Sequence, residues 1–241
     1  MKQNLTLMLS AVMLVVASCS KSKDEPKDEA VSCQLTESSS PNGKTTYTYN
    51  GDGKLTASKI DAYQETYEYT STSIIWKFIE PSGTIYTTTY LLDAQGRVKS
   101  SSDNSSNSTF TYNSERYLTE VNTVGSSAGK VTYTWTNGNL TKVERITTYG
   151  TNTINIEYGT ESRPTGFNGD ISSHLETAYW HDGDTQILTS SAFGKQPKNL
   201  VAKVSNTTYT YTKDNNANIT KMVEKAQGGS ETVYEYKYNC K

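Results

Sequence analysis

Residues Thr45–Thr56 read TTYTYNGDGKLT, and this stretch decides the fold. Tyr47 and Tyr49 alternate with threonines, so in an extended strand both rings lie on one face of the sheet. Asn50–Gly53 supply residue types that tolerate the positive φ of a tight turn. A second alternating run begins at Leu55. The stretch therefore predicts two antiparallel strands joined by a turn, which is one β-hairpin.

The same pattern recurs along the chain. Steps of 20 to 23 residues separate the aromatic residues that end successive alternating runs, which are Tyr49, Tyr69, Tyr90, Tyr112, Trp135 and Tyr158, and the pattern returns at Tyr211 and Tyr236. A repeat of this length fits two short strands and two turns. We therefore expect an all-β fold, an antiparallel up-and-down meander of about 14–16 short strands. We expect it to curl into a barrel or near-barrel, because an open sheet would leave two exposed edges.

The alternation also predicts which side chains face the barrel interior, because a slip of one residue would invert a whole strand. The inward positions are expected to be Tyr47, Tyr67, Tyr133, Tyr209 and Tyr234, and the outward positions Thr46, Thr48, Thr132 and Thr134. Two stretches are expected to differ from this pattern. Ser100–Ser108 is interpreted as a polar loop tip, and Ile74–Ile79 as a strand covered on both faces.

Some of the hairpins resemble a known repeat. Tyr49–Thr56 and Asp93–Val98 are similar to the tyrosine–aspartate (YD) repeat of bacterial surface proteins, roughly Y-D-x-x-G-R-L-T, and Tyr112–Thr119 and Asp214–Thr220 are more degenerate copies. The layout from about Cys33 to Cys240 also resembles a family of Bacteroidota lipoproteins of uncharacterised function. The domain of that family is described as a porin-like β-barrel. The resemblance implies an architecture and is nearly silent on function.

Residues 1–18 predict a lipoprotein signal peptide. Lys2 supplies the positive charge, and the apolar run Leu5–Val16 has 12 residues, which is too short to span a bilayer. Val16-Ala17-Ser18-Cys19 resembles a bacterial lipobox, which implies cleavage before Cys19 and acylation of that residue. Several acyl chains on one residue would anchor the protein stably. An ordinary secretory signal, with Cys19 incidental, is the alternative.

Residues 19–30 are interpreted as a flexible tether, because they contain charged residues and a proline but no apolar run. The run Lys23–Glu25 resembles the surface-export signals of Bacteroidota lipoproteins. We therefore expect a lipid-anchored protein of the outer membrane, with the cell surface favoured over the periplasmic face. The β-barrel domain is expected at 31–241. A formal net charge of −2 gives no electrostatic argument for a nucleic-acid partner.

The repeat breaks over 159–200, which is interpreted as an insert that plugs or caps the barrel. A short helix is predicted over Thr185–Phe193, with Asp184 as its cap and Gly194 at its end. Within the insert, Tyr179, Trp180, His181 and Asp182 combine aromatic faces with hydrogen-bonding groups, as a saccharide site does. The alternative is that these side chains pack the insert onto the barrel.

The sequence contains no nucleophile elbow, phosphate-binding glycine loop, HExxH motif or paired-cysteine zinc site. We therefore expect no catalytic residue, no cofactor and no metal. The expected function is non-catalytic binding, of a glycan or a protein, or a structural role at the cell envelope. The alternatives are a surface hydrolase acting on polysaccharide and a transmembrane pore. Most of the alternating runs are shorter than the 9–11 residues with which a strand crosses a bilayer.

The remaining cysteines predict a disulfide. Once Cys19 is lipidated, Cys33 and Cys240 are left in an exported chain, where disulfides persist. They stand at the two ends of the meander, and a closed meander brings its first and last strands side by side. A bond between them would fasten the seam of the barrel. Two free thiols at frayed ends are the alternative.

Overall fold

The computed structural model describes residues 33–165, 167 and 191–240, all in the unit Val31–Lys241. In chain order the strands are β1 Cys33–Ser40, β2 Gly43–Tyr49, β3 Leu55–Ile60, β4 Tyr63–Tyr69, β5 Ser73–Ile79, β6 Ile85–Leu92, β7 Val98–Ser102, β8 Ser106–Tyr112, β9 Leu118–Gly125, β10 Gly129–Thr136, β11 Asn139–Thr147, β12 Gly150–Ser162, β13 Asn199–Val204, β14 Thr207–Lys213, β15 Ile219–Lys225 and β16 Glu231–Cys240. A 3-10 turn, η1, spans Ser191–Phe193. Across these described ranges, no helix is long and apolar enough to cross a membrane.

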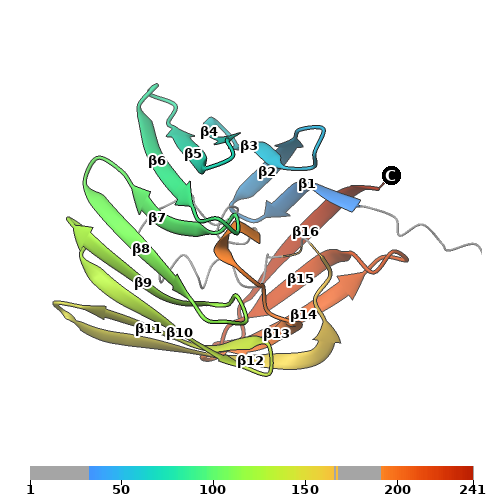
Figure 1. The fold of residues 1–241 in the computed structure, drawn as a ribbon. Coiled ribbons are helices and arrows are strands. Elements are labelled where there is room, and N and C mark those ends of the chain that lie inside the picture. The colour runs from blue at the N-terminus through green and yellow to red at the C-terminus, as the bar shows by residue number, and fades with distance from the viewer. Residues whose placement is uncertain (1–32, 166, 168–190, 241) are drawn as a thin grey trace, which may run out of the picture. The chain divides into compact units, whose positions relative to one another are not determined.

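The sixteen strands form one closed barrel (Figure 1). Each strand pairs antiparallel with its neighbours in the chain, and β1 also pairs with β16. The predicted all-β meander of 14–16 strands is therefore confirmed, including its closure. Successive strands run in opposite directions, so alternate turns lie at opposite ends of the barrel. We call the end that carries Cys33 and Cys240 the terminal end, and the opposite end the far mouth.

The turn of the quoted hairpin explains its sequence. Asn50 Oδ1 accepts hydrogen bonds from the backbone nitrogens of Asp52 and Lys54, each at 3.0 Å. Gly53 has a φ of 76°, a conformation that glycine adopts at little cost. An Asn or Asp at the first position and a residue that tolerates positive φ at the fourth are therefore what this turn requires.

Asp93 begins the same type of turn four strands later. Its Oδ1 accepts hydrogen bonds from the backbone nitrogens of Gln95 and Arg97, both at 2.9 Å, and Arg97 Nε donates to Oδ2 at 2.8 Å. Burial alone would raise the pKa of Asp93. The hydrogen bonds from Arg97 and Gln95 outweigh burial and hold this pKa below its ordinary value. The turn therefore keeps Asp93 charged.

One face of the barrel wall is buried, as the alternation predicts. Tyr67, Tyr133 and Tyr209 are 3%, 5% and 6% exposed. Tyr47 and Tyr234 on the same face are half-buried. The outward threonines are exposed, apart from Thr132, which is half-buried. The buried face is the interior of the barrel, because Phe167 and Phe193, which lie between β12 and β13 in the chain, contact it from opposite sides.

Two sequence interpretations are wrong. Ser100–Ser108 is not a loop tip, since β7 and β8 occupy all but residues 103–105. Ser106 and Ser108 are buried there, and the hydroxyl of Ser108 lies 2.8 Å from that of Thr123, so hydrogen bonding compensates for burying a polar group. In Ile74–Ile79 only the inner face is buried, at Ile74 and Trp76, whereas Ile75, Lys77 and Ile79 on the outer face are half-buried. A barrel wall is a single layer, so its other face meets solvent, where Lys77 pairs with Glu68.

The insert is shorter than predicted. β12 continues to Ser162 and β13 begins at Asn199, so the insert spans 163–198 rather than 159–200. The side chain of Asn199 donates from Nδ2 to the carbonyls of Thr160 and Glu161, at 3.1 and 3.3 Å, where the strand register shifts. The shift leaves these two carbonyls without a partner in the β12–β13 ladder. The Asn199 amide satisfies them, so the two strands stay paired as far as Ser162.

The described residues of the insert lie against opposite walls of the barrel. Phe167 contacts Tyr211 and Tyr236 on β14 and β16, and Phe193 contacts Tyr90 and Phe110 on β6 and β8. Both phenylalanines are buried. Figure 1 shows η1 inside the ring of strands. The described part of the predicted helix Thr185–Phe193 is this 3-10 turn, and Asp184 and residues 185–190 lie outside the described residues.

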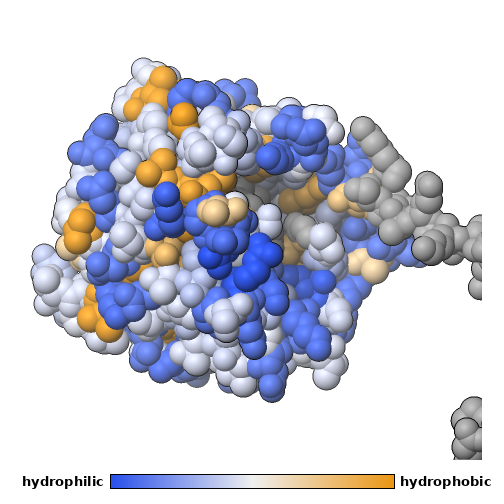
Figure 2. Space-filling view, viewed as in Figure 1, coloured by the Kyte–Doolittle hydropathy of each residue, from blue (hydrophilic) through white to orange (hydrophobic). Residues whose placement is uncertain are grey.

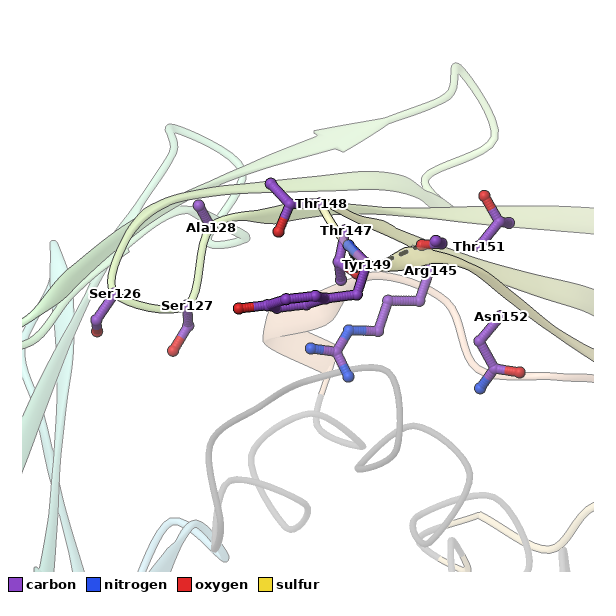
Figure 3. Close-up of a pocket in the computed structure, with 10 residues that line it drawn as sticks. Ser126, Ser127, Ala128, Arg145, Thr147, Thr148, Tyr149, Thr151 and Asn152 are labelled. Carbon is purple, nitrogen blue, oxygen red and sulfur yellow. Dashed lines mark hydrogen bonds between the residues drawn. The ribbon is translucent and has the colours of Figure 1, made fainter.

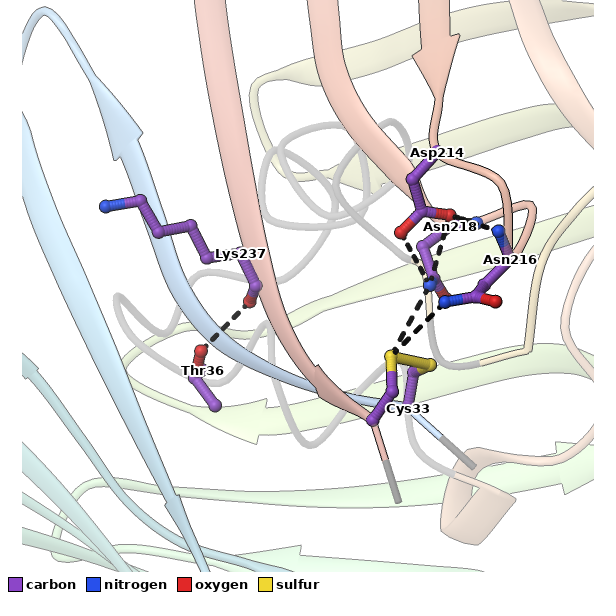
Figure 4. The surroundings of a disulfide bond; sticks show 7 residues. Cys33, Thr36, Asp214, Asn216, Asn218 and Lys237 are labelled. Carbon is purple, nitrogen blue, oxygen red and sulfur yellow. Dashed lines mark hydrogen bonds between the residues drawn. A yellow bond between two sulfur atoms is a disulfide. The ribbon is translucent and has the colours of Figure 1, made fainter. Parts of the chain in front are cut away.

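The disulfide between Cys33 and Cys240 is present (Figure 4). The two residues are direct partners in the β1–β16 ladder, and their Cα atoms are 4.0 Å apart. The side-chain amides of Asn216 and Asn218 donate from Nδ2 to Cys240 Sγ at 3.9 and 3.8 Å. The bond therefore joins the first and last strands at the seam, as predicted.

Candidate functional site

The binding residues that the sequence singles out, Tyr179, Trp180, His181 and Asp182, lie outside the described residues. The predicted lipidation residue Cys19 lies outside them as well. These assignments stay predictions. Within the described ranges, no group of three His, Cys, Asp or Glu residues could hold a metal ion. The candidate site below is built from other residues.

Four aromatic side chains form a continuous row on the inner face of β4, β5 and β6. We call Tyr63, Trp76, Phe78 and Tyr86 the aromatic ladder. Phe78 lies at its centre: its ring centroid is 5.8 Å from that of Tyr63, 6.1 Å from that of Trp76 and 6.2 Å from that of Tyr86. The Tyr63 and Phe78 rings are stacked at an interplanar angle of 11°.

Strand register explains why these rings meet. Phe78 is the direct partner of Tyr86 on β6, and residues directly opposite each other share a face. Trp76 is two residues earlier on β5, so it points to the same side. The Tyr67–Trp76 pair lies in the buried interior, which fixes the ladder to the inner face.

Exposure increases along the ladder toward the far mouth. Trp76 is 3% exposed and Phe78 is half-buried, whereas Tyr63 and Tyr86 are 43% and 50% exposed. The β3–β4 turn and the β5–β6 turn flank these two tyrosines, and both turns belong to the far mouth. A row of rings that begins in the core and ends in solvent presents aromatic faces to a ligand, while its buried end keeps the row in place.

A carboxylate lies next to the ladder. Glu65 on β4 is the direct partner of Phe78 on β5. It therefore lies beside Phe78 on one side, as Tyr86 on β6 does on the other. Its Oε2 accepts a hydrogen bond from Ser58 Oγ at 2.7 Å and another from the Tyr67 hydroxyl. Burial raises the pKa of the neighbouring Tyr47, and the negative charge of Glu65 raises it further. The site therefore combines aromatic faces with an oriented hydrogen-bond acceptor.

The two inward carboxylates stand on strands that are well separated in the sheet. Glu224 on β15 is a second inward carboxylate, 3.1 Å from the hydroxyl of Tyr234. Five strand spacings separate β15 from β4 around the barrel, which places their backbones about 24 Å apart along the wall. Paired carboxylates of glycoside hydrolases lie roughly 5–10 Å apart. Along the wall, the backbones that carry Glu65 and Glu224 are farther apart than this.

Sequence reasoning missed the ladder, although part of its signal is visible. Tyr63, Glu65 and Tyr67 alternate, as do Trp76 and Phe78. Period 2 alone shows that the members of each set share a face. The contact between Phe78 and Tyr86 depends on the β5–β6 register, and the place of the rings at a barrel mouth depends on how the sheet closes.

Comparisons with known proteins bear on the fold. No family model and no curated protein sequence matches this chain. A porin-like protein from Bacteroides uniformis aligns with a TM-score of 0.66 at 17% identity, over 88% of this chain and 94% of that one. A porin-like protein from Bacteroides vulgatus aligns with a TM-score of 0.60 at 11% identity, over 85% and 98%. The expected porin-like barrel architecture is thus confirmed, and nothing in these comparisons supports the YD repeat.

Proposed function

We propose that this chain is a lipid-anchored protein of the outer membrane whose barrel binds a glycan at the far mouth without transforming it. The aromatic ladder carries this proposal. The CH-rich faces of sugar rings stack on aromatic rings, and their hydroxyls donate hydrogen bonds to a carboxylate such as Glu65. Tyr63 and Tyr86 supply exposed rings beside that acceptor. Cys33, the first residue of β1, lies at the terminal end, opposite the mouth that carries the ladder.

The outer face of the barrel favours this function over a transmembrane pore. A pore-forming barrel presents an apolar band to lipid. Here Lys77 pairs with Glu68, Lys130 with Glu120 and Lys203 with Glu157 across the outside of neighbouring strands, at 2.6, 2.6 and 3.3 Å. Figure 2 shows hydrophilic and intermediate residues over most of the visible face, interrupted by separate hydrophobic patches. Such a surface is suited to water.

Truncating the ladder is expected to weaken glycan binding. The double variant Tyr63→Ala/Tyr86→Ala removes two stacking faces, each worth about 0.5–1.5 kcal/mol. We expect its dissociation constant for a bound oligosaccharide to rise about 5–150-fold. A panel of neutral and acidic oligosaccharides would identify a ligand, and titration calorimetry would then compare the variant with the wild-type protein.

Ile85→Ala is the matched control, because Ile85 precedes Tyr86 on β6, points to the outside and is 56% exposed. It should bind like the wild type. If no glycan binds, or if the ladder variant binds as tightly as the wild type, the proposal is wrong. Turnover of an oligosaccharide that Glu65→Gln abolishes would establish the hydrolase alternative instead.

The lipid anchor makes a separate prediction. Replacing Cys19 by Ala removes the residue that would be acylated, so no acyl chain would hold the protein in the membrane. We expect most of the variant in the soluble fraction when cells are broken and membranes are sedimented, whereas the wild type sediments with the membranes. Equal sedimentation of both proteins would place the anchor elsewhere.

A further inference from the structure

Cavities lie at both ends of the barrel. One of about 490 Å³ lies at the far mouth, between the β9–β10 turn and the β11–β12 hairpin. Figure 3 shows polar side chains on one side of the sheet there, those of Ser126, Ser127, Arg145 and Asn152. Another, of about 310 Å³, lies at the terminal end and has large aliphatic side chains in its wall. Small-molecule sites measure about 300–1,000 Å³, so this terminal cavity has room for one compact ligand.

The wall of the terminal cavity is apolar. Leu55 on β3, Ile74 on β5 and Leu92 on β6 line it, together with the ring of Tyr69 on β4. Tyr69 is the direct partner of Ile74, so both side chains lie on the same face of the sheet. Ile74 is buried, and the other three side chains pack against the core. Inside the ring of strands, η1 contributes two small residues to the lining.

Lys54 supplies the only charge among the ten described residues that line this cavity. Its Nζ lies over the ring of Tyr69, 5.2 Å from the centroid. The backbone of Lys54 is fixed, because its nitrogen donates to Asn50 Oδ1 at 3.0 Å and its carbonyl accepts from the nitrogen of Asn50 at 2.9 Å. The side chain is exposed, and within the described part of the chain its ammonium forms no ion pair.

The Asp93 turn repeats this arrangement with one difference. Arg97 stands at the position of Lys54, four residues after the first turn residue, and its guanidinium lies 4.6 Å from the centroid of the Tyr112 ring. Asp93 Oδ2 pairs with this cation at 2.7 Å. Asn50 takes the place of Asp93 and is neutral. It makes the same backbone hydrogen bonds, but it leaves Lys54 without the carboxylate that Arg97 has.

We propose that the terminal cavity binds a small organic acid with one carboxylate and a compact apolar body. The carboxylate accepts hydrogen bonds from the Lys54 ammonium, which are stronger than those between neutral groups. The apolar body packs against Leu55, Ile74 and Leu92. A second charge on the ligand would lie against these aliphatic side chains at a cost, so the site favours a monoanion. The cavity lies at the opposite end from the aromatic ladder, and the inference does not depend on glycan binding.

The test compares phenylacetate with phenylacetamide, which has nearly the same shape and no charge. Titration calorimetry with the full-length wild-type protein should show at least about 10-fold tighter binding of the acid, because hydrogen bonds to a charged group correspond to about 10–100-fold in affinity. Lys54→Met keeps the aliphatic stem, loses the charge and should lose this preference. Lys54→Arg should retain it. Lys59→Met removes an exposed cation of β3 that does not line the cavity, and should bind like the wild type.

Asn50→Asp is a second and independent variant. It keeps the turn, since Asp93 makes the same hydrogen bonds, and gives Lys54 a carboxylate of its own that competes with the ligand. We expect it to weaken phenylacetate binding about as much as Lys54→Met does. Equal binding of acid and amide by the wild type would overturn the inference. So would an unchanged preference in either variant at a wild-type thermal unfolding midpoint, or binding of neither probe at millimolar concentration.

Discussion

Removing the disulfide between Cys33 and Cys240 is expected to lower the free energy of unfolding by about 3–5 kcal/mol. The two cysteines are 207 residues apart in sequence, so the bond closes nearly the whole barrel domain into one loop. On the chain-entropy model a loop of this length restricts the unfolded chain by about 5 kcal/mol. Typical domains have stabilities of only about 5–15 kcal/mol, so the loss is large.

The structural position of the bond adds to this expectation. Apart from β12 and β13, which the insert connects, neighbouring strands are joined by short turns, whereas β1 and β16 are joined by no local connection. Their ladder also contains a register shift between Leu35 and Glu37. Thr36 Oγ1 donates to the carbonyl of Lys237 at 3.1 Å beside this shift, as Figure 4 shows. Without the covalent bond, the seam is where we expect opening to begin.

Urea denaturation would measure the effect in a background that carries Cys19→Ala, so that only two cysteines remain. The double variant Cys33→Ser/Cys240→Ser and the chemically reduced parent should show the same lowered midpoint. The slope of the free energy against urea should rise, because the unfolded chain is less compact. Two free thiols in the oxidised parent, or an unchanged midpoint in the double variant, would contradict the prediction.

Truncating Phe193 to Ala is expected to destabilise the barrel by about 3–5 kcal/mol, the usual cost of removing a buried aromatic side chain. Phe193 is 3% exposed, and its ring centroid lies 5.6 Å from that of Tyr90 and 5.5 Å from that of Phe110. Both contacts are edge-to-face. Phe193 therefore belongs to the core of the barrel.

The backbone that follows Phe193 is also fixed, by close contacts with the carbonyl oxygen of Arg116. Gly194 has a φ of 91°, and a Cβ added there would lie 2.4 Å from the carbonyl oxygen of Arg116. The backbone nitrogen of Lys195 donates to that same oxygen at 3.0 Å. Because this attachment limits relaxation, the space left by Phe193→Ala is expected to remain as a cavity.

Thermal and urea unfolding of Phe193→Ala would test this. Tyr149→Ala is the control, since its ring is fully exposed and its loss should change stability by less than about 0.5 kcal/mol. A cost below about 1 kcal/mol for Phe193→Ala would mean that the insert contributes little to the core, and the view of the insert as part of the barrel interior would be wrong.

Much of the fold was predictable because its information is local. An Asn or Asp at the first position of a turn and a residue that tolerates positive φ at the fourth define the hairpins at Asn50 and Asp93 within five residues. The alternation of Tyr and Thr assigns the inner face. The disulfide followed from these two observations, because a closed meander has one seam and its ends carry the cysteines.

The errors arose where burial depends on a neighbouring strand. Ser106 and Ser108 look like loop residues in sequence, and only the hydroxyl of Thr123 on β9 makes Ser108 a suitable buried residue. Similarly, the apolar run Ile74–Ile79 indicates a strand, but the single-layered wall exposes one of its faces. The residue types of a strand alone do not show which of its two faces is buried in a barrel.

The sequence by itself determined the hairpins, their number within narrow limits, the inner face and the pairing of the two cysteines, because each depends on residues close in the chain or on the two ends of a closed sheet. Only the tertiary structure decided which side chains form a site. Phe78 meets Tyr86 through the β5–β6 register, and Tyr63 and Tyr86 share one mouth because the β3–β4 and β5–β6 turns lie at the same end of the barrel. Register and closure depend on how all the strands pair with one another, so no single stretch of sequence determines them.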